Sequence, residues 1–259
     1  MRTLGVDLSA NPAKTGACLI DWEAVTVDLL PRPTEDDAIL AAAREADMVA
    51  LDVPLGWPDG FVQAVVAHHA GTGWPPVAYP PPGDRLPLRY RATDLAVRAR
   101  GGAPLSVSSD LIGVAAMRGA RLQQLLEDDG IPVDRSGMSG RVIETYPAMA
   151  LRQWGLRSTG YKGRTNADTC RTLVADLLVM CGPIGVVASA TLEGCDDDAL
   201  DAFVCALVAR ARLLGRTDPP PPHLGSTAHR EGWIHLPSAG LADALEIKPA
   251  PGRSSSSRS

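Results

Sequence analysis

Two acidic residues that close apolar segments constrain the fold of this chain more than any other feature. Asp7 ends the apolar run that includes Leu4 and Val6, and Asp52 ends a second run over residues 48–51. A carboxylate is costly to bury inside a sheet, but it is well placed at a strand end, where ligands bind to α/β sheets. We therefore expect strands over residues 3–7 and 48–53, with both carboxylates at the rim of one sheet.

A third acidic segment opens a strongly apolar helix predicted over residues 197–214. Asp198 and Asp201 are three residues apart and share a face of this helix. Helix capping accounts for part of the acidic cluster, but not for Asp201, which lies a turn further in. Carboxylates that converge from two strand ends and one helix start repel one another unless a cation sits among them, and hard divalent ions prefer oxygen ligands. The pattern predicts an Mg²⁺ or Mn²⁺ site on Asp7, Asp52, Asp198 and Asp201.

Composition limits the class of protein. The chain has 259 residues, 45% of them hydrophobic, which is enough for one core and a small insertion. No apolar run reaches the ~18 residues that span a bilayer, and the N-terminal residues lack a secretory pattern, so we expect no membrane partner. Five scattered cysteines are typical of a reduced, cytoplasmic protein.

Charge argues against a broad basic surface that coats nucleic acid, because the net charge is −5. The basic residues are nevertheless concentrated in two stretches. Residues 85–100 hold five arginines against Asp94 alone, and residues 141–171 hold six basic residues against Glu144 and Asp168, a local excess of +4 in each. Guanidinium groups suit bidentate phosphate contacts, although codon composition also explains the preference for arginine over lysine.

Periodicity and turn residues predict one α/β domain over residues 1–237, with a mixed β-sheet flanked by helices. A loop and helical insertion is expected around residues 59–130. Residues 238–259 are expected to form a tail that is disordered from about residue 249. Residues 231–237 are either a last strand or an extended segment. Residues 71–87, crowded with proline and glycine, are expected to form an ordered loop beside the site, with disorder as the alternative. The further expected strands cover 17–22, 24–30 and 142–146. The expected helices cover 34–46 (capped by Thr34), 61–69, 91–100, 112–129, 148–155, 167–180 and 197–214.

Several other residues are candidates to contact a substrate. Glu144 lies inside a predicted strand, where it is either a ligand or a partner for an arginine, and the sequence leaves both open. Trp57 follows a proline–glycine turn and could wall a pocket. The candidates to hold a phosphate are Arg91, Asp94, Tyr161 and Lys162, with ordinary solvated side chains as the alternative.

Taken together, these motifs resemble the family called domain of unknown function 429. The resemblance covers residues 2–237 and adds Glu231-Gly-Trp-Ile to the segments above. Members of that family are regarded as predicted nucleases with a ribonuclease H-like fold. The resemblance implies that Asp7 is the first-strand ligand, that Asp52 is the fourth-strand carboxylate, and that Asp198 and Asp201 are ligands on the C-terminal helix. One departure is the Asp-Leu-Ser of the first strand, where Asp-x-Gly is commoner.

The expected function is therefore metal-dependent hydrolysis of nucleic-acid phosphodiester bonds by a two-metal carboxylate site, with Lys162 or an arginine of 85–100 neutralising the phosphate. Two alternatives stay open. One is a non-catalytic scaffold that binds nucleic acid or a protein, and the other is an ATP-dependent phosphotransferase or ATPase on the same core. The sequence does not distinguish DNA from RNA.

Overall fold

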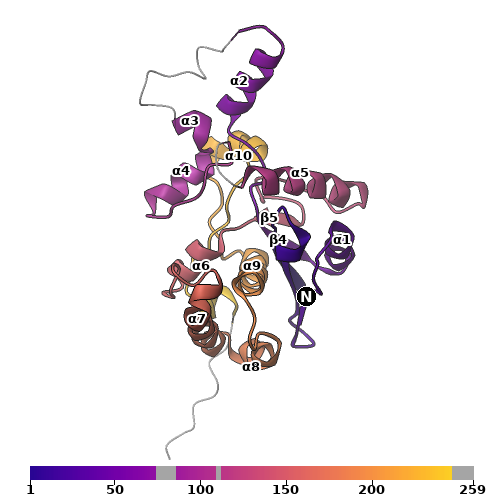
Figure 1. Ribbon diagram of the computed structural model, residues 1–259, viewed down its shortest axis with the longest axis vertical. Coiled ribbons are helices and arrows are strands. Elements are labelled where there is room, and N and C mark those ends of the chain that lie inside the picture. Colours follow the sequence, from indigo (N-terminus) through magenta and orange to yellow (C-terminus); the bar gives the residue numbers. More distant parts are fainter. Residues whose placement is uncertain (74–85, 109–111, 247–259) are drawn as a thin grey trace, which may run out of the picture.

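The computed structural model describes residues 1–73, 86–108 and 112–246, and its centre is a mixed five-stranded sheet (Figure 1). The strand order is β3-β2-β1-β4-β5. The strand bounds are β1 Arg2–Asp7, β2 Gly16–Asp21, β3 Thr26–Leu29, β4 Met48–Asp52 and β5 Val142–Glu144. The predicted α/β class and mixed sheet are confirmed.

Strand β1 lies in the middle of the sheet and fixes the register of its neighbours. It pairs antiparallel with β2 and parallel with β4, while β2–β3 is antiparallel and β4–β5 is parallel. Asp7 lies opposite Gly16 on one side and opposite Asp52 on the other. Because β1 and β4 are parallel, their acidic last residues meet at one edge of the sheet.

Helices cover both faces of the sheet, and together with β-strand alternation they divide the core in two. Leu4 and Val6 face a core that includes residues of α1 and α5, whereas Ala50 and Ile143 face one formed with α6 to α9. The helix bounds are α1 Asp36–Glu45, α2 Asp59–His69, α3 Leu86–Arg89, α4 Ala92–Ala99, α5 Gly113–Asp128, α6 Pro147–Gln153, α7 Ala167–Met180, α8 Gly182–Thr191, α9 Asp197–Leu213, α10 Gly225–Glu231 and α11 Leu241–Ala244.

Helix α9 lies directly against β1, and Gly5 allows this close approach. A Cβ atom at Gly5 would lie 2.1 Å from the carbonyl oxygen of Ala202 and 2.2 Å from the nitrogen of Ala206. Gly16 of β2 has the same function at the start of the helix, where a Cβ would lie 2.2 Å from the carbonyl oxygen of Asp198. The two glycines thus bring the acidic start of α9 next to the acidic end of β1.

The N-terminus of α1 differs from the prediction. The helix begins at Asp36 after Glu35, and Thr34 does not cap it. The Thr34 hydroxyl donates instead to the carbonyl oxygens of Thr15 and Pro31. The capping prediction was wrong because this hydroxyl is used to hold the turn between β1 and β2 to the segment that enters α1.

Helices α3, α8, α10 and α11 were not predicted from the sequence, and α3 begins inside the predicted loop 71–87. Helix α8 is rich in glycine, proline and β-branched residues, which have low helix propensity. It forms because Ile184 and Ala188 pack into the core beside α7. Local propensity is therefore overridden by burial in this segment.

The C-terminal part of the described chain returns to the sheet. Ile234 forms a single parallel bridge with Glu144, so residues 232–237 are an extended segment beside β5 and not a full strand, while Glu231 ends α10. Helices α2 to α5 lie between β4 and β5 in the sequence, and α2 projects away from the sheet (Figure 1). The predicted disordered tail from 249 and most of the predicted loop 71–87 lie outside the described residues. Among the helices described, none has the length and apolarity needed to cross a membrane.

Candidate functional site

Asp7 and Asp52 form a pair of strand-end carboxylates on the α9 side of the sheet. They are partners in the β1–β4 register and share a face with Gly5 and Ala50. Neither carboxylate has a hydrogen bond or ion pair with another of the described residues. Burial raises the pKa of Asp52 to about 7, and burial together with the charges of Asp52 and Asp201 raises the pKa of Asp7 well above its ordinary value. The fold thus holds two carboxyl groups together without a protein cation bound to either.

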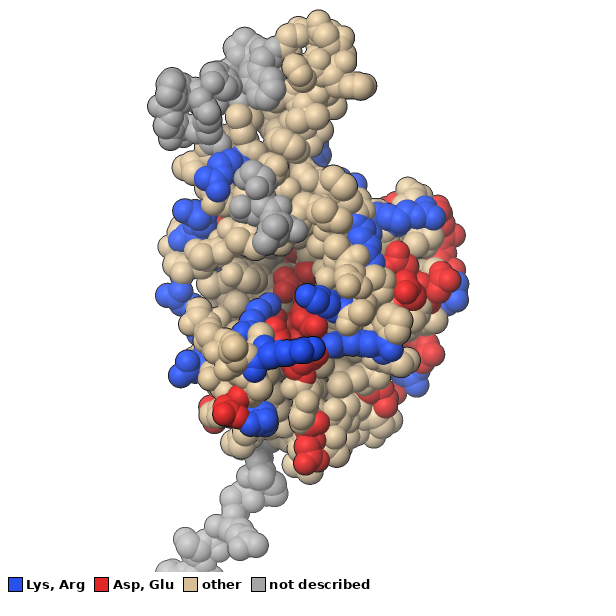
Figure 2. Space-filling model, in the orientation of Figure 1, with Lys and Arg blue, Asp and Glu red and all other residues tan. Residues whose placement is uncertain are grey.

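A cavity of about 580 Å³ opens over this pair. Its lining includes the charged residues Asp7, Asp52 and Lys162 and the apolar residues Leu105 and Ile112. Figure 2 shows acidic side chains at the floor of a hollow near the middle of this face, with basic side chains around and across it. The hollow therefore combines a negative floor with a positive rim, an arrangement that suits an anionic substrate held through a cation.

Asp201 differs from the strand-end pair because both of its carboxylate oxygens have partners. It is fully buried in α9, where Oδ1 accepts a hydrogen bond of 2.8 Å from the Tyr161 hydroxyl. Oδ2 forms an ion pair of 2.5 Å with Nζ of Lys162, whose side chain is 54% exposed. Burial lowers the pKa of Lys162, but the charges of Asp201, Asp52 and Asp7 outweigh it and raise that pKa above its ordinary value. Lys162 is therefore a permanently charged ammonium group held at the cavity.

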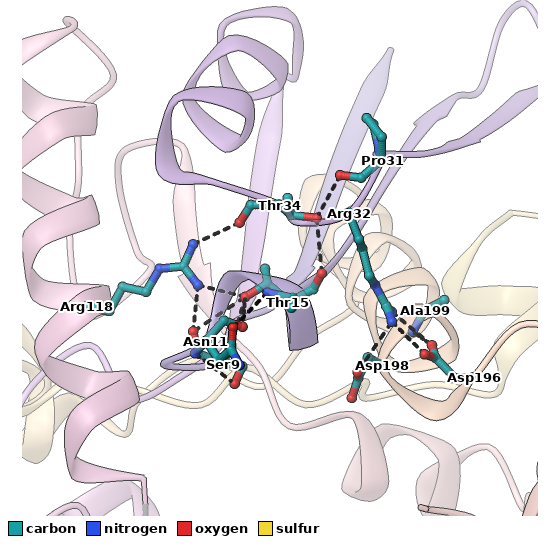
Figure 3. Close-up of polar contacts among 11 residues, drawn as sticks. Ser9, Asn11, Thr15, Pro31, Arg32, Thr34, Arg118, Asp196, Asp198 and Ala199 are labelled. Atoms are coloured by element: carbon teal, nitrogen blue, oxygen red, sulfur yellow. Dashed lines mark hydrogen bonds and ion pairs between the residues drawn. The ribbon is translucent and has the colours of Figure 1, made fainter. Parts of the chain in front are cut away.

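Asp198 lies in the first turn of α9, where the helix backbone meets Gly16 of β2, and its side chain points towards Arg32 (Figure 3). Its Oδ2 is 3.5 Å from Nη1 of Arg32. The same guanidinium binds both carboxylate oxygens of Asp196, at 2.5 and 2.8 Å, and Asp196 also caps α9 through the backbone nitrogen of Ala199. Asp196 is thus the capping residue, while Asp198 faces an arginine.

The four acidic residues predicted as metal ligands therefore occupy three different environments. Within the described part of the chain, no group of three or more His, Cys, Asp or Glu side chains is arranged to hold a metal ion. The Asp7–Asp52 pair nevertheless fits a hard divalent ion, because Mg²⁺ usually binds one or two carboxylates and completes its shell with waters and substrate phosphates. The unpartnered, mutually repelling carboxyls are the observation that supports this fit.

Arg91, Asp94 and Glu144 form a buried ionic cluster that borders the cavity. Arg91 is 2% exposed, and its side chain makes five hydrogen bonds. Asp94 accepts two of them, Glu144 accepts two, and the carbonyl oxygen of Glu231 accepts one. A guanidinium has five N–H donors, so Arg91 has none left for a phosphate. That these three residues bind substrate stays a prediction, since their contacts here are with one another and with the backbone.

Strand alternation explains why Glu144 does not join the aspartates. It lies opposite Leu51 in the β4–β5 register, one residue before the position level with Asp52, and therefore on the other face of the sheet. Its Oε2 also accepts a hydrogen bond from the backbone nitrogen of Leu55. Glu231, which the sequence motif included without a role, accepts from the first backbone nitrogens of α2 and α4, at Asp59 and Ala92.

Of the remaining candidates, Tyr161 lies at the site and Trp57 does not line the cavity. Tyr161 is 1% exposed, and its position depends on its bond to Asp201. Trp57 is half-buried beyond the end of β4 and is not among the described residues that line the 580 Å³ space. The prediction that it walls a substrate pocket stays untested.

Arg118 and Arg32 are two residues near the site that the sequence reasoning did not identify (Figure 3). Arg118 of α5 donates to the carbonyl oxygens of Ser9 and Thr34 and to the hydroxyl of Thr15, and so holds the turn that follows Asp7. Arg32 holds the start of α9. Single arginines in polar segments carry no periodic signal, so only the tertiary structure identifies them.

Comparison with known proteins gives a family but no activity. Neither the curated proteins nor the solved structures include a match to this chain. A family model with the description "Protein of unknown function (DUF429)" matches residues 5–224, which include Asp7, Asp52, Lys162 and Asp201. The match spans most of the chain, from the second half of β1 through β5 to the end of α9 and beyond. The chain therefore belongs to the DUF429 family.

Proposed function

We propose that this protein is a divalent-metal-dependent nuclease with a ribonuclease H-like fold. The observation that carries the proposal is the pair of unpartnered carboxylates, Asp7 and Asp52, in register at one edge of the sheet and open to a cavity. The strand order and the position of α9 against β1 agree with the first-strand, fourth-strand and C-terminal-helix positions that the resemblance implies.

The reaction would be hydrolysis of a phosphodiester bond. Water attacks phosphorus, the bond to the 3′ oxygen breaks, and the leaving oxygen takes up a proton from the attacking water. Asp7 and Asp52 would hold the divalent ion, either Mg²⁺ or Mn²⁺, and such an ion supplies charge stabilisation and a lowered pKa for water.

The protein's own groups would position the phosphate. Lys162 reaches the cavity from a loop and carries a fixed positive charge that can neutralise a phosphate oxygen. Asp201 and Tyr161 orient it, and both are buried, so the ammonium group is held before substrate binds. The substrate would therefore be nucleic acid, bound through its backbone at this cavity.

The test is cleavage of a panel of single- and double-stranded DNA and RNA, a hybrid and a four-way junction, with Mg²⁺ or Mn²⁺. We expect the wild type to cleave at least one member and Asp7→Asn to cleave none. The matched control is Asp176→Asn, which removes an exposed carboxylate on α7 and should leave cleavage unchanged. Cleavage retained by a folded Asp7→Asn variant would contradict the proposal.

Absence of cleavage by the wild type would favour the non-catalytic scaffold. The phosphotransferase alternative has less support, because the described residues form a single five-stranded sheet and give no second lobe to close over a nucleotide. ATP-dependent thermal stabilisation of the wild type would revive that alternative.

A further inference from the structure

The environment of Lys162 leads to a more specific statement about the same site. Resting on the nuclease function proposed above, we propose that the site binds a single divalent ion on Asp7 and Asp52. The Lys162 ammonium group, held by its ion pair with Asp201, which also accepts a hydrogen bond from Tyr161, neutralises the substrate phosphate in place of a second ion.

The first step of the argument concerns which carboxylates are free. Asp7 and Asp52 form no hydrogen bond or ion pair with the described residues, whereas both oxygens of Asp201 have a partner, one in Tyr161 and one in Lys162. A second ion that used Asp201 would have to displace an ammonium group from a contact of 2.5 Å. The structure therefore offers one ligand pair and one protein cation.

The second step concerns the other candidate for a second ion. Asp198 faces Arg32 at 3.5 Å, in the first turn of α9, where the helix backbone contacts Gly16 of β2. Arg32 is itself fixed by two hydrogen bonds to Asp196. A second ion on Asp198 would lie beside a guanidinium group, which repels it.

The third step is the balance of charge. Asp7, Asp52 and Asp201 carry three negative charges when ionised and Lys162 carries one positive charge, so these four groups have a net charge of −2. One divalent ion neutralises the remainder, whereas two would leave the site with a net positive charge before substrate binds. A single ion with two carboxylates also matches the preference of Mg²⁺ for few protein ligands.

The structure also shows why a lysine can take this position. Tyr161 is buried against α9, and the positive φ of Gly160 (69°) and Gly163 (86°) lets the chain turn on both sides of the Tyr161–Lys162 pair. The Lys162 stem is thereby directed at Asp201 while half of the side chain stays exposed to the cavity and solvent. An ammonium group held in this way has donors left for a phosphate oxygen.

The test counts bound Mn²⁺ by electron paramagnetic resonance, which measures free Mn²⁺ during titration and reports coupling between neighbouring bound ions at low temperature. We expect one Mn²⁺ per wild-type chain, without Mn–Mn coupling. We expect Lys162→Met to bind Mn²⁺ at least about tenfold more tightly, because a repelling unit charge is removed, and to accept a second, coupled ion on the freed Asp201. The control, Arg164→Met, removes the same charge from an exposed position two residues away and should bind like the wild type.

The outcomes separate this inference from the nuclease proposal. Two coupled ions in the wild type, or Mn²⁺ binding unchanged in Lys162→Met, would overturn the single-ion inference, even where nucleic-acid cleavage is retained. Equal Mn²⁺ binding by the wild type, Asp7→Asn and Asp52→Asn would show that these carboxylates hold no ion, and would overturn the metal-dependent function together with the inference. Thermal unfolding of each variant checks that the fold is intact.

Discussion

Replacement of Arg91 by alanine tests whether the ionic cluster beside the cavity holds the fold together or binds substrate. Arg91 is 2% exposed and is the cationic partner of Asp94 and Glu144, which are 1% and 2% exposed. Its removal leaves two buried carboxylates unpaired and a carbonyl oxygen of Glu231 without this donor. Residues from β5, α4 and the end of α10 lose their common contact.

The expected loss of stability is large. Breaking one buried ion pair by removal of one partner costs about 3–5 kcal/mol, because a buried charge is left uncompensated. Two carboxylates are affected here, so we expect a loss of about 5 kcal/mol, comparable with the lower end of the total stability of a typical protein. At roughly 2–4 °C per kcal/mol for a chain of this size, the Tm would fall by about 10–20 °C.

The measurement is urea unfolding followed by far-ultraviolet circular dichroism, with thermal scans as a second readout. Arg100→Ala is the matched control, since Arg100 pairs with Asp218 at the surface and the two side chains are 46% and 33% exposed. An exposed pair contributes less than about 1 kcal/mol. Arg91→Lys should lose about half as much stability as Arg91→Ala, because an ammonium keeps the charge but has three donors and no planar fork.

A pH series adds an independent check on the physical cause. Burial already raises the pKa of Glu144 above its ordinary value while the charge of Arg91 opposes that rise. Without Arg91 the rise is larger, so the folded Arg91→Ala variant binds protons that the unfolded chain releases, and its deficit should shrink as the pH falls from 8 to 5. The reasoning is refuted if Arg91→Ala loses no more stability than Arg100→Ala. A stable Arg91→Ala variant that fails to bind nucleic acid would instead make Arg91 a substrate ligand.

Three further predictions follow from single residues. Asp52→Asn should stabilise the metal-free protein by roughly 2–4 kcal/mol at pH 8 and by less at pH 5 in urea titrations. Burial raises the pKa of Asp52 to about 7, so the stability of the wild type falls as the pH rises from about 4 to 7. An equal effect at both pH values would contradict this. Gly5→Ala should lower the free energy of unfolding by about 1–3 kcal/mol in the same assay and displace α9, since its Cβ would lie 2.1 Å from the carbonyl oxygen of Ala202. A stability equal to that of the wild type would disprove the close contact. His235 is buried with Nε2 donating to the carbonyl oxygen of Ser136, and burial lowers its pKa to about 4. The wild type should therefore lose up to about 3 kcal/mol of unfolding free energy between pH 6.5 and pH 4, a loss that His235→Gln should not show. An unchanged acid sensitivity in His235→Gln would assign the loss to other groups.

The sequence by itself determined the strand-end positions of Asp7 and Asp52 and the start of the acidic helix. Each of these features is local: an apolar run that ends at a carboxylate, or a run of aspartates before apolar residues, shows both the element and its boundary. Most of the strands and helices could be predicted from the sequence for the same reason. Helix α8 was not, because its residues favour a helix only when Ile184 and Ala188 are buried.

Only the tertiary structure decided what each acidic side chain contacts. Asp198 and Asp201 share a helix face in the sequence pattern, yet Asp198 lies beside Arg32 and Asp201 beside Lys162, because α9 packs against β1 and its first two turns meet different segments of the chain. The sequence left Glu144 open as either a ligand or a partner for an arginine. In the structure its partner is Arg91, which immediately precedes α4 and lies 53 residues earlier in the chain. Spacing along a sequence gives the face on which a charge lies, but the partner of that charge depends on which distant segments the packed core brings beside it.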